Sequence, residues 1–368
     1  MTEVLLKQLN SQDLQWLKSN GKKQHIDSGA CLIQQSEAVE YLYIILNGEF
    51  VGVIAKQSEG VLGRTFSALE DDSNLEREIM RLGEGEVIGE MSFLDLSPAT
   101  TTFTALKNSL VLEISSHKLR RKLQQDSGFA ARFYRAIAIL LTKRFEHLVA
   151  LYLRKRLGKL RPLQDIPLLF GEFKDSDLDW MVYCGLLQRV PPGQTLTQAG
   201  RQAENLYIIL RGKMSLIVNE AQGNQIDKIF MALELEEDSQ AELEREIAQL
   251  TQGEIVGASA TFDSYLSTVT LRTQSDTILL AIPKEQLLLK LQQDPAMAAR
   301  FYRAIAILLS GRLQGLINRL GFGKGSYQFG QSLSSGEEYE DEIDPAVMDN
   351  IFLGGARFDW MLKRLKII

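Results

Sequence analysis

Residues 81–114 read RLGEGEVIGEMSFLDLSPATTTFTALKNSLVLEI. Three glycines (Gly83, Gly85 and Gly89) mark bends in the first third of this stretch, a polar loop follows, and the end is rich in β-branched and apolar residues. Glycines next to such a run predict turns that lead into strands. A partial copy of the stretch recurs at residues 250–282, so the chain is a tandem repeat.

The segment after each copy is the closest internal match. It reads LQQDSGFAARFYRAIAILL at residues 123–141 and LQQDPAMAARFYRAIAILL at residues 291–309. We predict a helix in each, with Asp126 and Asp294 as N-caps and Pro295 in the first helical position. Apolar residues spaced by three and four predict one apolar face, which packs either on its own half of the chain or on the other copy, within one chain or between chains. These residues are Phe133, Ile137, Leu140 and Leu141, with Phe301, Ile305, Leu308 and Leu309 in the second copy.

Short strands separated by turns precede the central stretch in each half. The run YLYIIL at residues 41–46 is closed by Asn47-Gly48, which is a typical hairpin signal. Residues 206–212 repeat this run as LYIILRG. The layout predicts a mainly β fold.

Further segments flank the strands. A leading helix is expected with Ser11 as its N-cap and Gly21 as its stop. Inserts at residues 57–74 and 219–242 each carry an acidic cluster, which favours an extended hairpin with a solvated tip or, alternatively, a loop that contacts a partner.

A basic run follows the first copy of the repeated helix. We expect a connecting helix with a solvated basic face, although the pattern also fits an amphipathic helix on a membrane or nucleic acid. The basic residues are Lys143, Arg144, Arg154, Lys155, Arg156, Lys159 and Arg161.

The chain from residue 321 belongs to neither copy. Glycine, serine and acidic residues predict a flexible linker, and Pro345 marks a plausible helix start. The apolar end at residues 358–368 docks either on the chain's own surface or on a partner.

These repeated features resemble the cyclic-nucleotide-binding domains of the cyclic AMP receptor and of the regulatory subunits of protein kinase A. The resemblance implies two tandem cyclic-nucleotide-binding-like jelly-roll domains, mainly β with flanking helices. We expect the first at residues 1–160, the second at residues 161–320, and an acidic linker with a C-terminal helical tail at residues 321–368.

The resemblance also implies a ligand pocket in the first domain. In the family a Gly-Glu pair opens a short helix, the glutamate takes a ribose hydroxyl, and an arginine clamps the cyclic phosphate. Gly89 and Glu90 keep the pair, but Ala99 stands where the family has arginine. The threonines at 100–102 either donate to an anion or face solvent. The candidate ligand-binding residues are Gly89, Glu90, Met91, Ser92, Ala99, Thr100 and Thr101.

The second pocket departs further from the family pattern. Its matching residues are Gly257, Ala258 and Ser259, so the carboxylate is missing, and the loop at residues 262–267 carries no arginine. We interpret this pocket as degenerate.

Composition and motifs exclude several function classes. The net charge of −6 argues against nucleic-acid binding, and no recognition helix follows either repeated helix. The three histidines, His25, His117 and His147, lack metal-ligand spacing and are expected to be surface or locally satisfied groups, and no catalytic motif is present. We therefore expect no enzyme, no cofactor and no metal.

Two cysteines, the lack of a secretory signal and the lack of a long apolar segment predict a cytoplasmic protein without a membrane span. Two functions stay open: a regulatory or adaptor scaffold with a protein partner or self-association, and a sensor of a cyclic nucleotide or another small anion acting through the first domain. Similar modules also occur beside bacterial peptide exporters, and this resemblance implies a bacterial, secretion-linked role.

Overall fold

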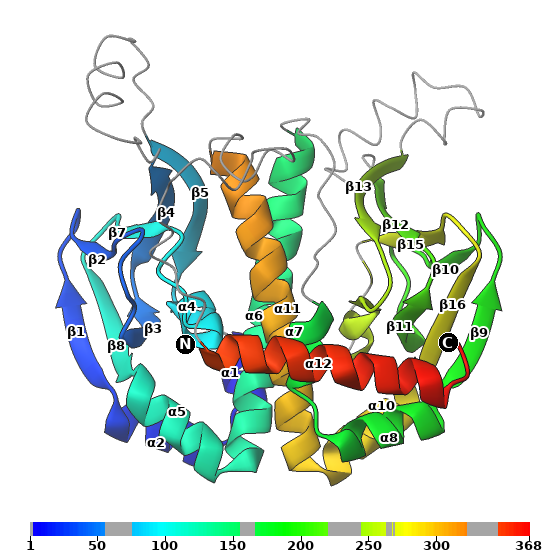
Figure 1. Cartoon of the computed structure of the whole chain (residues 1–368). Coiled ribbons are helices and arrows are strands. Elements are labelled where there is room, and N and C mark those ends of the chain that lie inside the picture. The colour runs from blue at the N-terminus through cyan, green and yellow to red at the C-terminus, as the bar shows by residue number, and fades with distance from the viewer. Residues whose placement is uncertain are drawn as a thin grey trace. The chain divides into compact units, whose positions relative to one another are not determined.

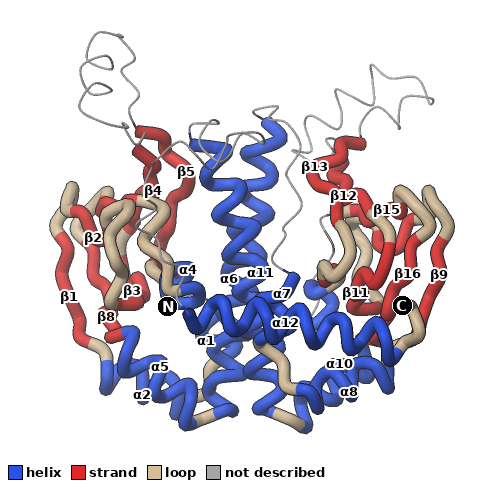
Figure 2. The backbone as a smooth tube through the Cα atoms, viewed as in Figure 1, coloured by secondary structure: helices blue, strands red, loops and turns tan. Residues whose placement is uncertain are grey.

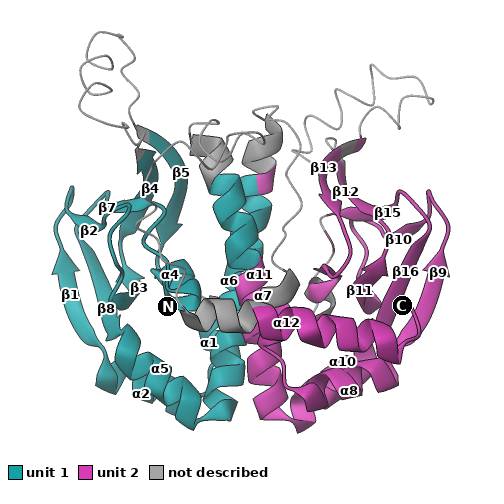
Figure 3. Ribbon diagram, in the orientation of Figure 1, with its two compact units in different colours: residues 1–148, 309–338 teal, residues 149–308, 339–368 magenta. Residues whose placement is uncertain are grey.

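The computed structural model describes most of the chain (Figure 1). The described residues are 3–55, 76–154, 166–219, 244–262, 267, 269–321 and 345–368. They divide into two compact units (Figure 3): unit 1 comprises residues 1–148 and 309–338, and unit 2 comprises residues 149–308 and 339–368. The domain boundaries expected from the sequence stay a prediction.

Unit 1 contains two four-stranded antiparallel sheets. The first has the order β1 (Lys22–Ile26), β8 (Ser109–Ser115), β3 (Tyr41–Asn47) and β6 (Val87–Ile88). The second has the order β2 (Cys31–Ile33), β7 (Thr102–Ala105), β4 (Glu49–Ala55) and β5 (Glu76–Gly83). Eight strands in two sheets are the architecture of a jelly roll.

Unit 2 repeats this strand order. Its first sheet runs β9 (Leu186–Val190), β16 (Thr277–Pro283), β11 (Asn205–Arg211) and β14 (Ile255–Val256). Its second runs β10 (Thr195–Thr197), β15 (Thr270–Thr273), β12 (Met214–Asn219) and β13 (Glu244–Leu250). The expectation of two tandem jelly rolls is confirmed.

The hairpin expected at Asn47-Gly48 is wrong. β3 pairs with β8 and β6, whereas β4 pairs with β5 and β7, so the chain changes sheets at Gly48. Gly48 has φ +119°, and a Cβ there would lie 2.0 Å from the hydroxyl oxygen of Ser109. The glycine therefore allows a close approach of the chain to Ser109 at the start of β8, and its local signal resembles that of a hairpin turn.

Helices precede and follow the strands of each unit (Figure 2). Unit 1 has α1 (Glu3–Gln8), α2 (Ser11–Asn20), α4 (Glu90–Asp95) and α5 (Ser116–Gln125). Unit 2 has α7 (Ile166–Gly171), α8 (Asp175–Cys184), the 3-10 helix η3 (Ala258–Thr261), α10 (Lys284–Gln293) and α12 (Pro345–Arg364). The two long helices are α6 (Ser127–Arg154) and α11 (Pro295–Gly321). Helix α6 belongs to unit 1 up to residue 148 and to unit 2 after it, whereas α11 belongs to unit 2 up to residue 308 and to unit 1 after it.

The leading helix α2 begins one residue earlier than expected. Asn10, not Ser11, is its N-cap, because the Asn10 side chain accepts from the Asp13 amide while the Asp13 carboxylate accepts from the Asn10 amide. The expected stop at Gly21 is confirmed, since its amide donates to the Leu17 carbonyl.

The long helices begin as predicted. Asp126 accepts from the Phe129 amide, and Asp294 accepts from the Met297 amide, at 2.9 Å each. Pro295 is the first residue of α11. Both N-caps are therefore confirmed.

An arginine ties each long helix to the leading helix of its unit. Arg132 holds Asp13 with two hydrogen bonds of 2.6 and 2.9 Å, and Arg300 holds Asp177 with two of 2.6 and 2.7 Å. Bidentate geometry fixes the direction of both side chains. The apolar residues predicted on this helix are buried in both copies, except for the half-buried Leu308.

The C-terminal helix α12 lies on α7 and α8 within unit 2. The Phe358 ring contacts the Phe170 ring at a centroid distance of 5.2 Å, and Arg357 pairs with Asp175 at 2.8 Å. The helix start at Pro345 is confirmed, and the end of the chain docks on its own surface. The acidic tips of the inserts and the linker fall at residues 56–75, 220–243 and 322–344, outside the described residues.

Candidate functional site

Gly89 sets the geometry of the first candidate site. It is the N-cap of α4 with φ +91°, a backbone conformation that side chains with a Cβ rarely adopt. A Cβ there would lie 2.9 Å from the Tyr41 carbonyl. The next three residues, Glu90, Met91 and Ser92, form the first turn of α4, and Glu90 is 3% exposed.

The loop after α4 brings Ala99 beside this turn. Ala99 is buried, its amide donates to the Glu37 carbonyl, and its carbonyl accepts from the Ser36 amide. The position therefore offers neither a cation nor a free backbone donor. Thr101 is also buried, and its hydroxyl has no hydrogen-bond partner among the described residues.

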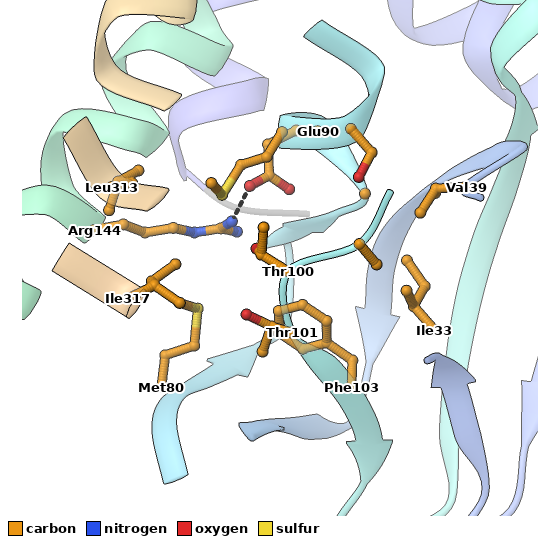
Figure 4. Close-up of a pocket in the computed structure, with 14 residues that line it drawn as sticks. Ile33, Val39, Met80, Glu90, Thr100, Thr101, Phe103, Arg144, Leu313 and Ile317 are labelled. Carbon is orange, nitrogen blue, oxygen red and sulfur yellow. Dashed lines mark hydrogen bonds and ion pairs between the residues drawn. The ribbon is translucent and has the colours of Figure 1, made fainter. Parts of the chain in front are cut away.

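All seven residues predicted for the first pocket line one cavity in unit 1 (Figure 4). Its free space is about 30 Å³, which holds one or two water molecules. A drug-sized ligand needs roughly ten times more. The remaining lining residues are Ile33, Val39, Met80, Phe103, Arg144, Leu313 and Ile317.

Arg144 from α6 occupies one side of this cavity, facing Glu90 (Figure 4). Its Nη1 donates to the Glu90 carboxylate at 2.5 Å. Its Nη2 donates to the Glu86 carboxylate at 2.9 Å and to the Val87 carbonyl at 2.5 Å, and its Nε donates to Glu86 at 3.3 Å. All three guanidinium nitrogens are thus engaged by groups of the chain itself.

Burial and charge compete at this pair. Burial raises the pKa of the Glu90 carboxyl above its ordinary value, and the neighbouring Arg144 opposes that shift. Burial disfavours the charge on Arg144, but the carboxylates of Glu90 and Glu86 hold its pKa above the usual range. The Arg144 guanidinium is therefore charged at neutral pH, and its hydrogen bond keeps the Glu90 carboxylate oriented toward α6.

The expectation of a solvated basic face is wrong for Arg144. The residue is 8% exposed, because it lies on the side of α6 that packs on the cavity, whereas its neighbour Lys143 is exposed. Nothing in the local sequence separates the two residues. The expectation that threonines here face solvent is likewise wrong for Thr101.

The second candidate site keeps the backbone geometry without the carboxylate. Gly257 has φ +81° and precedes η3, as Gly89 precedes α4. The position of Glu90 is taken by the half-buried Ala258, and Ser259 follows in η3. Among the described residues of unit 2, no acidic side chain replaces Glu90 at this helix start.

His25, His117 and His147 are all exposed, as expected. In the part of the chain that the structure describes, no group of three or more His, Cys, Asp or Glu side chains is arranged to hold a metal ion. Within the same residues, no helix combines the length and apolar character needed to cross a membrane.

Two jelly rolls, each with a glycine that precedes a short helical turn after β6 or β14, make a pair of repeated modules. The family model described as "Cyclic nucleotide-binding domain" matches residues 23–126 and 187–294, which together exceed half of the chain. The chain therefore belongs to the cyclic nucleotide-binding domain family. No curated protein matches it.

Several solved structures are similar to this chain. The regulatory domain of Toxoplasma gondii protein kinase A with cAMP shares 14% identity over 79% of this chain and 89% of that chain, with a TM-score of 0.28. The regulatory subunit of a cAMP-independent protein kinase A from Trypanosoma brucei shares 16% identity over 80% and 89%, with a TM-score of 0.27. A cyclic nucleotide-binding domain from Methylobacillus flagellatus shares 22% identity over 43% and 83%, with a TM-score of 0.36.

Proposed function

We propose that this chain is a non-enzymatic regulatory or adaptor scaffold in the cytoplasm, whose first pocket is closed by its own Arg144–Glu90 pair and takes no cyclic nucleotide. The proposal rests on the ion pair between Arg144 and Glu90. Glu90 is the residue that would bind a ribose hydroxyl, and its carboxylate is already the partner of a buried arginine.

The charge of the pocket supports the same conclusion. A cyclic phosphate carries a negative charge that is costly to bury without a cation. Ala99 supplies none, and Arg144 is shared between two carboxylates and a carbonyl. A bound phosphate would therefore have to break the existing pair or remain uncompensated.

The size of the cavity adds a steric reason. Leu313 and Ile317 line it together with Met80 and Phe103, and the space left among them is about 30 Å³. Admission of a nucleotide would require these side chains to move apart. The apolar lining gains stability from contact with itself, so the closed pocket is favoured.

One observation favours a second candidate, a sensor acting through the first domain. The Thr101 hydroxyl is buried at the cavity without a hydrogen-bond partner among the described residues. A buried polar group of this kind is satisfied when a ligand or water supplies the missing bond. On this alternative, the ligand displaces Arg144 from Glu90 and α6 transmits the change.

Calorimetric titration of the full chain with cyclic AMP and cyclic GMP tests the proposal. We expect no saturable heat at millimolar ligand. Saturable binding that is lost in Glu90→Ala would overturn the scaffold and establish the sensor. Circular dichroism of Glu90→Ala must match that of the parent chain, so that a loss of binding reports on the pocket.

A further inference from the structure

The corner at which α8 runs into β9 exposes large apolar side chains. Tyr183 near the end of α8 is 91% exposed, and Leu186 and Leu187 at the start of β9 are 58% and 44% exposed. Large exposed apolar patches on a folded protein mark interaction sites, and these three residues lie within five positions of one another in the chain. We call Tyr183, Leu186 and Leu187 the β9 corner.

The first repeat provides an internal control for this corner. The residues that correspond to Tyr183, Leu186 and Leu187 are Ser19, Lys22 and Lys23, because Gly185 and Gly21 both end the leading helices. In unit 1, Lys22 lies opposite Glu113 of β8, whereas in unit 2 Leu186 lies opposite Ala281 of β16. The same place in the same fold is thus charged in one copy and apolar in the other.

β9 is also an edge strand. It pairs with β16 along residues 186–190, and within the described residues no second strand pairs with it. An edge strand presents unpaired backbone N–H and C=O groups, and proteins commonly protect such edges with lysine. β1 carries that protection in Lys22 and Lys23, and β9 lacks it.

We propose that the β9 corner is a self-association surface, on which β9 of a second copy of this chain pairs antiparallel with β9 and continues the β14-β11-β16-β9 sheet. A strand that pairs antiparallel with itself makes a two-fold symmetric contact, which is the commonest arrangement of homodimers. The unpaired backbone groups of β9 favour the addition of another strand, and the exposed leucines favour a strand with apolar side chains. The inference does not depend on whether the pocket in unit 1 binds a ligand.

The charges of β9 fit a contact centred on Leu187. The two Leu187 side chains then meet at the axis, and Arg189, the one cation of the strand, lies opposite Gly185 of the other copy. The two Arg189 side chains are therefore kept apart. Two copies of β1 in the same arrangement would bring the two Lys23 side chains together, with Lys22 opposite Gln24, and the like charges of the two Lys23 side chains would repel.

Sedimentation equilibrium of the full chain between about 1 and 100 µM tests the association. We expect a concentration-dependent dimer whose dissociation constant rises at least tenfold in Leu186→Lys/Leu187→Lys, which copies the first repeat. Leu106→Gln is the matched control, because Leu106 is an exposed leucine of unit 1 whose counterpart is Gln274. A parent chain that stays monomeric, or a double lysine variant that dimerises equally well, overturns the proposal.

Cross-linking tests the register. In a Cys31→Ser/Cys184→Ser background, Leu187→Cys is expected to form an intermolecular disulfide under mild oxidation, because the two positions meet at the axis. Lys23→Cys, the equivalent position of the first repeat, is expected to stay uncrosslinked. Equal cross-linking of both variants would show non-specific contact and would overturn the assignment to β9.

Discussion

The guanidinium of Arg144 donates to the Glu90 carboxylate at 2.5 Å, although 54 residues separate them in the chain. Their side chains are 9% and 4% exposed. Removal of one member of a buried ion pair leaves the other charge uncompensated, whereas replacement of both by apolar residues is often neutral.

We therefore expect Arg144→Ala to lower the free energy of unfolding by about 3–5 kcal/mol. The double variant Arg144→Met/Glu90→Leu is expected to recover most of this loss, because Glu86 is partly exposed and stays hydrated. Urea unfolding monitored by circular dichroism measures both values. Additive losses in the double variant would contradict a coupled pair.

The N-cap of α6 gives a pH-dependent prediction. The Lys122 ammonium and the Phe129 amide hold the pKa of Asp126 below its usual value. A depressed pKa contributes stability above the unfolded pKa of about 3.9, and this contribution is lost as the pH falls through the folded pKa. Asp126→Ala is expected to cost about 1 kcal/mol at neutral pH and less as the pH falls through the lowered pKa, because the neutral carboxyl loses its attraction to Lys122.

Thermal unfolding at neutral and at acidic pH checks this expectation. Asp294→Ala is the matched variant in the second repeat, since the Met297 amide and Lys290 lower the pKa of Asp294 in the same way. A cost that is independent of pH in both variants would mean that the caps act without their charge.

The two thiols should differ in reactivity. Burial raises the pKa of Cys184 to about 11, so that only about one molecule in a thousand carries the thiolate at pH 8. Burial and the charge of Glu37 raise the pKa of Cys31 as well, but this residue is exposed. We expect iodoacetamide to modify Cys31 at least tenfold faster, as followed by mass spectrometry. Equal rates in the folded chain, without urea, would contradict the burial of Cys184.

The packing of α12 on α7 and α8 predicts that a mutation in this contact changes the hydrogen exchange of α12. Phe358 is 8% exposed against Phe170, and Arg357 also donates to the Gly171 carbonyl at the end of α7. Phe358→Ala is expected to remove about 3 kcal/mol of docking free energy. Hydrogen exchange of the α12 amides should then accelerate by more than tenfold, while Phe352→Ala, at a 70% exposed position, should leave it unchanged. Unchanged exchange in Phe358→Ala would mean that other contacts hold the helix.

Much of the fold was predictable because its signals are local. The repeated stretch at residues 81–114 and its copy indicated two domains, and the N-caps Asp126 and Asp294 acted through the amides three residues away. The seven pocket residues came together because they follow one another around a single helix and loop. The predicted N-cap of α2 was wrong by one residue, because Asn10 and Ser11 are both residue types that cap helices well.

The sequence by itself determined the repeat and the alanine at position 99, because internal similarity and residue identity need no knowledge of distant segments, whereas the jelly rolls and the missing arginine were expected from the family resemblance. Only the tertiary structure decided that Arg144 is a buried partner of Glu90, that Thr101 faces the cavity, and that Gly48 joins two sheets. The physical reason is that burial and charge pairing depend on which remote segments meet. A basic run on a helix has the same sequence pattern whether one of its arginines faces water or a carboxylate.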